Sequence, residues 1–194
     1  MKLSVIIPVY NQEGLILRAI QSIPPFKDVE IIVIDDCSTD GTLETVRLYQ
    51  QYSKQNIVVL HNDENKGVGY TVNRGYDVAQ GEYVVLLGSD DYFIDLYVLD
   101  ELDGADLIYF DLQINDGSVF HLEPNTKNLY CGSTKFMRRA FVGDLRNPEV
   151  RQAEDWFFYK SLLLKKPTEK YLNRVLKHYN YPRVGSLTWE ANHK

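Results

Sequence analysis

Acidic residues gather in two short polar stretches that each follow an apolar run. VIDDCSTDGT at residues 33–42 carries Asp35, Asp36 and Asp40, and GSDD at residues 88–91 carries Asp90 and Asp91. Neighbouring carboxylates repel each other unless a cation or hydrogen-bond donors offset their charge. A hard divalent cation such as Mg²⁺ or Mn²⁺ is the simplest partner, and it completes its shell with ligand phosphates. The pattern therefore indicates a nucleotide ligand.

The elements that must position these acids are predicted by hydrophobic patterns. Apolar, β-branched runs predict buried strands at LSVIIPV (3–9), EIIVID (30–35), NIVVLH (56–61) and EYVVLLG (82–88). Helical patterns lie between them, from about Glu13 to Ser22, from STDGT (38–42) onward, and at GVGYTVNRGYDVAQG (67–81). Ser38, Thr39 or Asp40 can accept the free N–H groups at the start of the second helix. The fold class is therefore α/β, with a mostly parallel, doubly wound, Rossmann-like sheet flanked by helices over about residues 1 to 100.

Polar segments follow all four predicted strands: PVYNQE, DDCSTD, HNDENKG and GSDD. Because the carboxyl ends of parallel strands lie at one edge of the sheet, we expect these segments to meet there. The acids expected around one cleft are Asp35, Asp36, Asp63, Asp90 and Asp91.

The second half of the chain has a different pattern. DLIYFDLQINDGSVFHLE (106–123) predicts a hairpin that turns at residues 115–118. STKFMRRAFVGDL (133–145) and EDWFFYKSLLLKK (154–166) predict helices, and the tail that begins at Tyr171 predicts a strand and a loop. We expect residues 101–194 to form a small C-terminal α+β cap on the same single domain.

Composition and charge exclude several classes of protein. Of 194 residues, 21 are Lys or Arg and 27 are Asp or Glu, so the net charge is −6. A nucleic-acid partner is not expected, because such proteins carry a basic stripe that displaces counterions from phosphates. Cys37 and Cys131 form neither a disulfide framework nor a zinc site, which favours a cytoplasmic location. We expect no signal peptide and no transmembrane segment.

Four stretches together resemble a known family. VIIPVYNQEGLILRAIQSI, EIIVIDDCSTDGT, NKGVGYTVNRGYDVAQGEYVVLLGSDD and AEDWFFYKSL occur in the order and spacing of inverting family 2 glycosyltransferases with the GT-A fold. The resemblance covers about residues 2 to 165. It implies metal-dependent transfer of a hexosyl or N-acetylhexosaminyl group from a UDP-sugar to a hydroxyl acceptor, in the synthesis of a cell-surface polysaccharide or glycoconjugate. Residues 1–100 would then be the nucleotide-sugar-binding half and residues 101–194 the acceptor-side cap.

The resemblance also implies roles for individual residues. Asp155 is the expected general base, supported by Glu154, and Asp36 is expected to accept a hydrogen bond from the uracil N3–H. Asp90 and Asp91 match the metal-binding DxD motif for Mn²⁺ or Mg²⁺, with His178 as a further metal or phosphate ligand. Tyr10 is available to stack on the uracil. The other residues expected to bind the nucleotide sugar are Pro8, Asn11, Glu13, Asn65, Gly67, Asn73, Ser89, Asp90, Arg183 and Ser186.

The sequence also departs from the family pattern. Gly88 replaces the first acid of the DxD motif, and Val72 replaces an arginine. One alternative function is therefore a catalytically weak nucleotide-sugar-binding module. Another is a sugar-nucleotide nucleotidyltransferase, although PVYNQEG lacks the basic residue that such an enzyme needs to hold a triphosphate. Peripheral membrane contact, a homodimer and a partner subunit are left open, as are the identities of the sugar and the saccharide acceptor.

Overall fold

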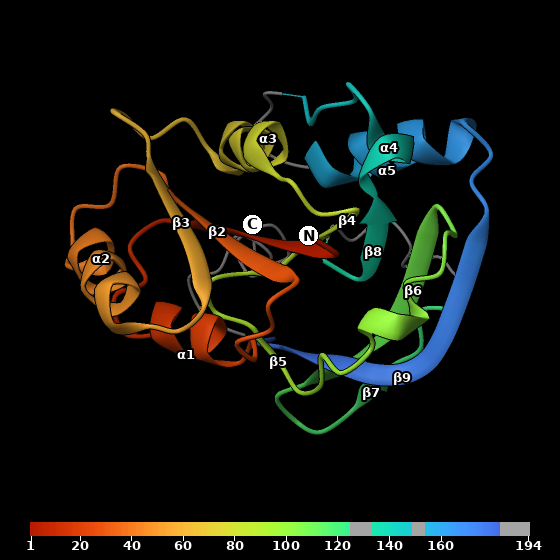
Figure 1. The fold of residues 1–194 in the computed structure, drawn as a ribbon, viewed down its shortest axis with the longest axis horizontal. Helices are drawn as coiled ribbons and strands as arrows, with labels where there is room; N and C mark the ends of the chain where they lie inside the picture. The colour runs from red at the N-terminus through yellow and green to blue at the C-terminus, as the bar shows by residue number, and fades with distance from the viewer. Residues whose placement is uncertain (125–132, 149–153, 183–194) are drawn as a thin grey trace.

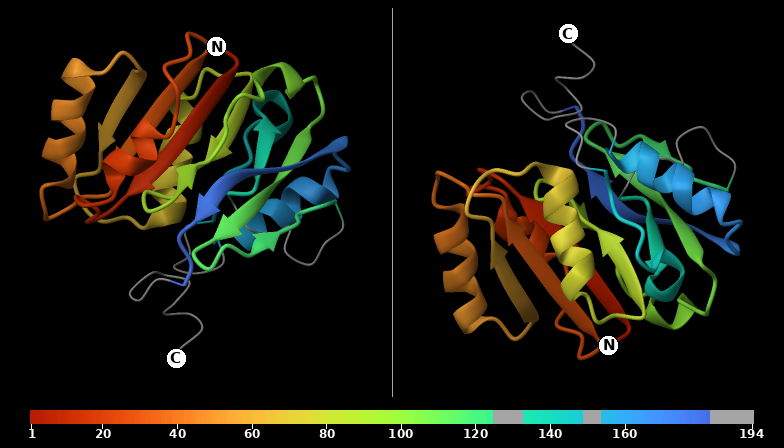
Figure 2. Two further views of the ribbon diagram at one scale, coloured as in Figure 1. Left: turned by 90° about the horizontal axis from the view of Figure 1, so that it is seen from below. Right: turned by 90° about the horizontal axis from the view of Figure 1, so that it is seen from above.

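The structure is a computed structural model that describes residues 1–124, 133–148 and 154–182, with Glu154 described by its backbone alone. Its described strands form one nine-stranded sheet in the order β3-β2-β1-β4-β8-β6-β9-β5, with β7 paired to β6 (Figure 1). Both halves of the chain contribute to this sheet, and its strands run on from one half to the other without a gap (Figure 2).

The first half has the predicted alternation of strands and helices. Its elements are β1 (Leu3–Val9), α1 (Ile16–Gln21), β2 (Val29–Asp35), α2 (Thr42–Tyr52), β3 (Asn56–His61), α3 (Val68–Val78) and β4 (Tyr83–Leu86). Strands β3, β2, β1 and β4 are all parallel, and Val9, Asp35 and His61 lie side by side at the carboxyl ends of β1, β2 and β3. The prediction of a doubly wound parallel sheet is confirmed.

The part of the chain that follows β4 extends the same sheet, and its described strands add four short antiparallel pairings and one long parallel pairing, that of β6 with β9. Its elements are β5 (Tyr92–Phe93), the short 3₁₀ helix η1 (Leu99–Glu101), β6 (Leu107–Ile114), β7 (Val119–Phe120), β8 (Lys135–Arg138), α4 (Arg139–Val142), α5 (Glu154–Leu164) and β9 (Glu169–Tyr179). Strands β6 and β7 are antiparallel, which confirms the predicted hairpin. The predicted helix at residues 154–166 and the predicted strand near the end of the described chain are also present.

The helix predicted over residues 133–145 is wrong. Residues 135–138 form strand β8, and a helix of only four residues, α4, follows it. Strand β8 lies between β4 and β6 and pairs with both, while Phe136 and Met137 are fully buried. Backbone groups buried in this position need hydrogen-bond partners, and only a strand can supply the ladder on both sides. Tertiary pairing therefore outweighs a local helical pattern.

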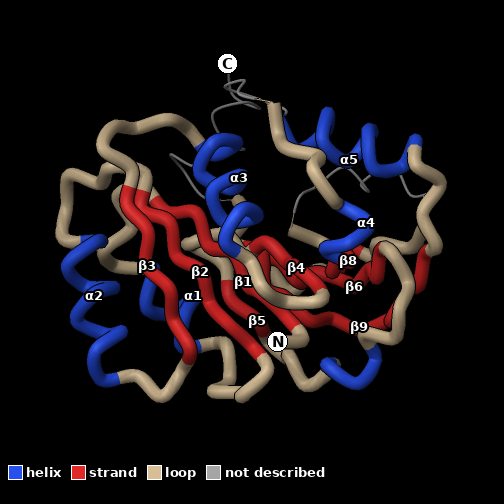
Figure 3. Tube along the Cα trace, turned by 45° about the horizontal axis from the view of Figure 1, so that its top comes forward, coloured by secondary structure: helices blue, strands red, loops and turns tan. Residues whose placement is uncertain are grey.

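Helices cover both faces of the sheet (Figure 3). On one face, Ile16 and Ala19 of α1 and Val46 of α2 pack into a core with Val5 and Ile7 of β1. The other core includes Ile6 of β1, Val72 and Tyr76 of α3, and Phe158 and Leu162 of α5. Successive residues of β1 thus face opposite cores, as the two-residue period of a strand requires. Because helices bury both faces of the sheet, ligand-binding groups must gather at the ends of the strands.

Candidate functional site

The polar loops that follow β1 and β2 are hydrogen-bonded to each other. The Asn11 side-chain oxygen accepts from the Thr39 backbone N–H at 2.8 Å, and the Asn11 backbone N–H donates to the Ser38 hydroxyl at 2.9 Å. The Glu13 backbone N–H donates to the Asp40 carboxylate at 3.2 Å. These contacts join the first two loops at the carboxyl edge of the sheet, as predicted from the parallel direction of the strands.

Asp36 joins the second loop to the third. Its buried carboxylate accepts hydrogen bonds from the Asn62 side-chain amide at 2.6 Å and from the backbone N–H groups of Lys66 and Gly67 at 2.9 and 2.8 Å. A carboxylate offers about four acceptor positions, so roughly one is left beyond these three donors. The predicted contact of Asp36 with a uracil N3–H stays a prediction, and it would have to use that position.

Asp35 and Asp40 serve the loop geometry. One Asp35 oxygen accepts from the Ser38 N–H at 3.1 Å and contacts His61 Nδ1 at 3.0 Å. Its other oxygen is buried and has no hydrogen-bond partner among the described residues. Asp40 accepts from the Thr42 N–H at 3.0 Å. Desolvation opposes ionisation of Asp40, but the hydrogen bonds from Thr42 and Glu13 outweigh it and lower the pKa of this carboxyl group.

The two acids after β4, Asp90 and Asp91, lie in different surroundings. Asp91 is 2% exposed, and its oxygens accept from Lys177 Nζ and from the Asn180 backbone N–H, each at 2.9 Å. Asp90 is half-buried, and its backbone carbonyl accepts from the Arg18 guanidinium at 2.6 Å. Both acids were predicted to bind metal, and these roles stay predictions; in the structure the Asp91 carboxylate is paired with a buried ammonium group.

Gly88 is the residue that lets this loop fold tightly. A Cβ atom at this position would lie 2.8 Å from an Asp91 carboxylate oxygen and 3.1 Å from an Asp90 carboxylate oxygen. Contacts this short are not tolerated unless the neighbours move. An acidic side chain at position 88 would also add a third negative charge there. The departure from the family pattern thus has a steric and an electrostatic reason.

His178 lies beside the same loop. Its ring stacks on Tyr92 with centroids 4.6 Å apart, and the Arg18 guanidinium lies over the Tyr92 ring at 4.9 Å. His178 Nδ1 is buried and has no hydrogen-bond partner among the described residues. Burial, together with the nearby Arg18 charge, lowers the pKa of His178, so the neutral ring is favoured. A role in metal binding stays a prediction.

The other residues predicted to bind the donor differ in how far they are exposed. Tyr10 is 45% exposed at the end of β1, next to the half-buried Pro8, and Asn65 is exposed in the third loop. Ser89 is buried. Both ends of the Asn73 side-chain amide bind the backbone of Asn147, at 2.8 and 2.9 Å.

The position of Val72 explains the missing arginine. Its side chain is 3% exposed in the core between α3 and the sheet, where an arginine could not be solvated. The arginine of this helix is Arg74, and it donates to the His61 carbonyl at 2.7 Å and to the Asn62 side chain at 2.5 Å. The Arg74 side chain therefore holds the third loop against helix α3.

On the predicted acceptor side, Glu154 and Asp155 begin helix α5 as expected. Asp155 accepts from the Trp156 backbone N–H at 2.8 Å. A negative charge in the first turn of a helix interacts favourably with the helix dipole. The predicted contacts Arg183 and Ser186 lie outside the described residues.

Three residues of this edge were not predicted from the sequence: Lys177, Arg18 and Asn62. Lys177 gave no signal, since polar and charged residues make up six of the eleven positions of β9, and nothing local indicates a partner 86 residues earlier. Arg18 likewise bonds to a residue 72 positions later.

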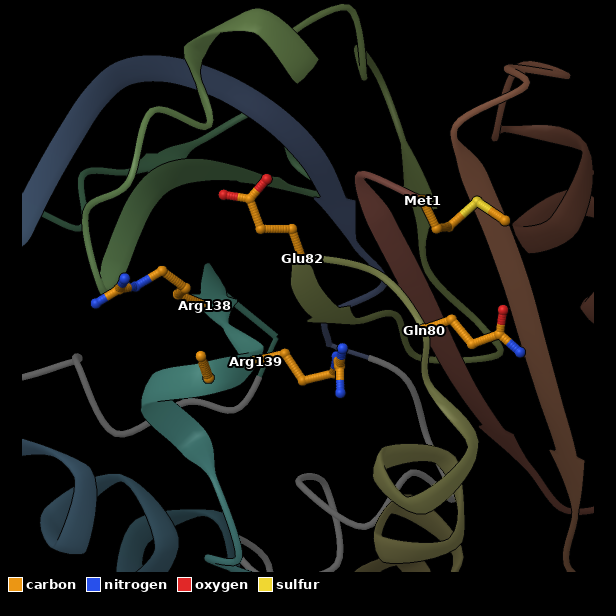
Figure 4. A pocket seen from close by; sticks show the side chains of 6 residues that line it. Met1, Gln80, Glu82, Arg138 and Arg139 are labelled. Atoms are coloured by element: carbon orange, nitrogen blue, oxygen red, sulfur yellow. The ribbon is translucent and has the colours of Figure 1, made fainter.

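A shallow pocket of about 360 Å³ lies at the opposite edge of the sheet, at the amino ends of β1 and β4 (Figure 4). Its lining includes Met1, Gln80, Glu82, Arg138 and Arg139. Arg138 forms an ion pair with Asp106, and Arg139 donates to the Gly81 carbonyl at 2.8 Å. This pocket contains none of the predicted site residues.

Within the described part of the chain, no group of three or more His, Cys, Asp or Glu side chains is arranged to hold a metal ion. A cation could therefore fit only if it took most of its ligands from elsewhere, which is how Mg²⁺ and Mn²⁺ bind with substrate phosphates. None of the described helices combines the length and the apolar character needed to cross a membrane.

Fold and site together define an α/β protein whose ligand-facing loops gather at the carboxyl ends of parallel strands. The family model described as glycosyl transferase family 2 matches residues 4–138, and the chain belongs to that family. The fold matches the GT-A fold of solved glycosyltransferases, as predicted.

Two relatives are informative. TuaG of Bacillus subtilis (strain 168), a glycosyltransferase named for teichuronic acid biosynthesis, is 29% identical over 98% of this chain and 84% of its own. Residues 1–349 of Staphylococcus aureus TarS, solved in complex with UDP-GlcNAc, align with a TM-score of 0.82 and 28% identity. That alignment covers 96% of this chain and 60% of the TarS chain.

A more distant structure shows the fold alone. A mannosyltransferase from Pyrobaculum calidifontis, in complex with GDP-Man and Mn²⁺, aligns over 97% of this chain and 59% of its own, with a TM-score of 0.75 and 20% identity. This chain thus spans most of TuaG but only about 60% of each of these two solved chains.

Proposed function

We propose that this chain transfers a sugar from a UDP-sugar to a hydroxyl group of a saccharide or glycoconjugate acceptor, with inversion and with the help of a divalent cation. The observation that carries the proposal is that the polar loops gather at the carboxyl ends of the parallel strands. The Asp36 network and the Asp90 loop lie at the carboxyl ends of β2 and β4, two strands that both flank β1. TarS, at 28% identity over nearly the whole chain, is solved with UDP-GlcNAc.

The donor half accounts for nucleotide binding. Asp36 retains acceptor capacity for an N–H of the base, and the exposed ring of Tyr10 is available to stack on it. The Asp90 carboxylate would hold a divalent cation together with the donor phosphates. Such an ion, when bound, stabilises the negative charge that develops on the departing nucleoside diphosphate.

The acceptor half supplies the base. Inversion requires an acceptor hydroxyl to attack the anomeric carbon from the face opposite the leaving nucleotide, and the hydroxyl proton must be removed as the new bond forms. Asp155, in the first turn of α5, is the carboxylate that would accept that proton. Glu154 precedes it and would bind the acceptor or support Asp155.

A thermal-shift screen with UDP-, GDP- and dTDP-sugars, each with and without Mn²⁺, tests the donor assignment. A ligand that binds only the folded state raises the melting temperature, by an amount that corresponds to about 2.7 kcal/mol at 100 times its Kd. We expect a shift for UDP-sugars that depends on Mn²⁺. If no nucleotide sugar raises the melting temperature, the donor assignment is wrong.

Transfer is tested with the Asp155→Asn variant on the same protein. We expect this variant to bind the UDP-sugar as the wild type does and to lose transfer by at least about 100-fold, the usual contribution of a general base. Wild-type binding without transfer to any saccharide acceptor would favour the nucleotide-sugar-binding module instead. Transfer that survives in Asp155→Asn would show that another group is the base.

A further inference from the structure

The ion pair between Lys177 and Asp91 has no place in the proposed reaction so far. Lys177 is 0% exposed and Asp91 is 2% exposed, and the distance from Nζ to Oδ2 is 2.9 Å. Lys177 comes from β9, where it lies opposite Phe93 of β5. A buried ammonium group costs several kcal/mol unless a counter-charge and hydrogen bonds compensate it. Asp91 supplies that counter-charge.

The other oxygen of Asp91 is also engaged. It accepts from the Asn180 backbone N–H at 2.9 Å, just beyond the end of β9. Asp91 also donates its own backbone N–H to the Gly88 carbonyl at 3.0 Å. Both carboxylate oxygens therefore face β9 and its extension. To reach a cation, this carboxylate would have to leave an unpaired ammonium group behind in the interior.

The neighbouring acid, Asp90, is less deeply buried. Asp90 is half-buried, and its backbone carbonyl is fixed by Arg18 of α1. The carboxylates of Asp90 and Asp91 both approach the bare Cα of Gly88, so the turn brings two negative charges close together. Pairing one of them with Lys177 relieves this repulsion.

We infer that Lys177 is a positioning residue for the donor site: it neutralises Asp91 and keeps it out of the cation's coordination shell, so that Asp90 supplies the carboxylate of this loop. The inference rests on the proposed function, because it concerns the cation that accompanies the donor. Asp91 then ties the loop to β9 and holds Asp90 in place, which revises the expected two-acid metal site.

The test is Mn²⁺ binding in the presence of UDP, measured by the electron paramagnetic resonance signal of unbound Mn²⁺. Three changes are compared with the wild type: Asp90→Asn, Lys177→Gln, and Asp91→Asn combined with Lys177→Gln. The double variant replaces a buried ion pair with two neutral amides that can hydrogen-bond to each other, so that neither charge is left buried without its partner. It therefore serves as the folded, charge-matched comparison.

We expect Asp90→Asn to weaken Mn²⁺ binding at least tenfold and the double variant to stay within about threefold of the wild type. Lys177→Gln alone releases a carboxylate beside the cation. It should lower the melting temperature without Mn²⁺ and gain more stability from Mn²⁺ than the wild type does, because the cation takes the place of the lost ammonium group. If this single variant does not fold, the double variant decides the question.

The outcomes separate this inference from the proposed function. If wild-type protein binds no Mn²⁺ with UDP, the metal-dependent donor site itself is wrong. If the wild type binds and the double variant loses Mn²⁺ as severely as Asp90→Asn, then Asp91 is a ligand, and the role given to Lys177 is overturned while the donor site stands. Retained binding in Asp90→Asn would also overturn it.

Discussion

The carboxylates of this protein differ in their hydrogen-bond and ion-pair partners. Asp36 holds a loop with three donors, and Asp91 is neutralised by Lys177. Asp106 shows the same principle away from the site. It accepts from Arg138 Nε at 3.0 Å and from the Thr168 N–H at 2.9 Å, which ties together the starts of β6, β9 and the end of β8. Sequence alone assigns these acids one charge each, whereas the fold assigns each a set of donors.

Asp106 gives a prediction for stability against pH. Desolvation would raise its pKa, but hydrogen bonds from Thr168 and Arg138 outweigh this and lower the pKa below the ordinary value of 3.8. The folded state therefore binds fewer protons than the unfolded state in acid. The stabilisation is fully present above about pH 3.8 and is lost as the pH falls through the lower, folded-state pKa.

The measurement compares the melting temperatures of wild type and Asp106→Asn from pH 7 to pH 3. At pH 7 we expect the variant to be less stable by about 2 kcal/mol, which lowers the melting temperature of a chain of this size by about 4 to 8 °C. The gap should close as the pH falls below 3.8. Asp100→Asn, at an exposed position, is the control and should show no such gap. A gap that stays constant with pH would contradict the assignment.

Among the elements, helix α3 approaches the sheet unusually closely, and a glycine makes this approach sterically acceptable. A Cβ atom at Gly75 would lie 2.5 Å from the Ile6 side chain and 3.1 Å from that of Ile34. Both isoleucines are fully buried, so neither can move without disturbing the core. The helix also carries Thr71, whose hydroxyl accepts from the Asn62 amide at 3.0 Å, so its position is linked to the Asp36 network.

Gly75→Ala should therefore destabilise the fold even though alanine is the better helix former. Overpacking costs about 1 to 3 kcal/mol, against a gain of at most about 1 kcal/mol from helix propensity. Urea denaturation should show a lower midpoint for Gly75→Ala. Gly14→Ala is the matched control, because no atom lies within 4 Å of its Cβ position. Equal midpoints for the two variants would mean that α3 can shift away from the sheet.

Strand β8 shows where element prediction from sequence failed. Residues 133–145 have an apolar spacing that suits a helix, yet residues 135–138 are needed as a strand between β4 and β6. That need arises from strands more than 20 residues away along the chain, so no local window contains it. The strands of the first half were predicted correctly because each is a continuous apolar run buried on both faces, and that signal is local.

At the scale of the whole molecule, β8 joins the two halves into one sheet. It pairs with β4 of the first half and β6 of the second, and the two helix-covered cores continue across this junction. We therefore expect residues 1–100 and 101–194 to unfold together. Both tryptophans, Trp156 and Trp189, lie in the second half, so fluorescence reports on that half while far-UV circular dichroism reports on the whole chain.

In urea, the two signals should give one coincident transition, the usual criterion for cooperative two-state unfolding. A chain that ends after Gly104 should show no cooperative transition, because it would expose the edge of β4 and the apolar sheet face that the second half covers. Two separated transitions in the full chain, or a folded fragment 1–104, would make the halves separate domains.

The sequence by itself determined the alternation of strands and helices, the parallel sheet they form, and the edge at which the polar loops meet. These follow from short-range periodicity and from the rule that carboxyl ends of parallel strands share an edge. It also placed Asp155 in the first turn of its helix. Each strand and helix that these features depend on is indicated by its own short stretch of sequence.

Only the tertiary structure decided what each acid does. The partners of Asp91 lie 86 and 89 residues away, and those of Asp36 lie 26 to 31 residues away. Burial makes these distant donors decisive, since a carboxylate removed from water depends on whichever hydrogen-bond donors and charges the fold brings to it. The sequence therefore shows where negative charge gathers, and the fold decides which of it is neutralised within the protein and which can meet a ligand.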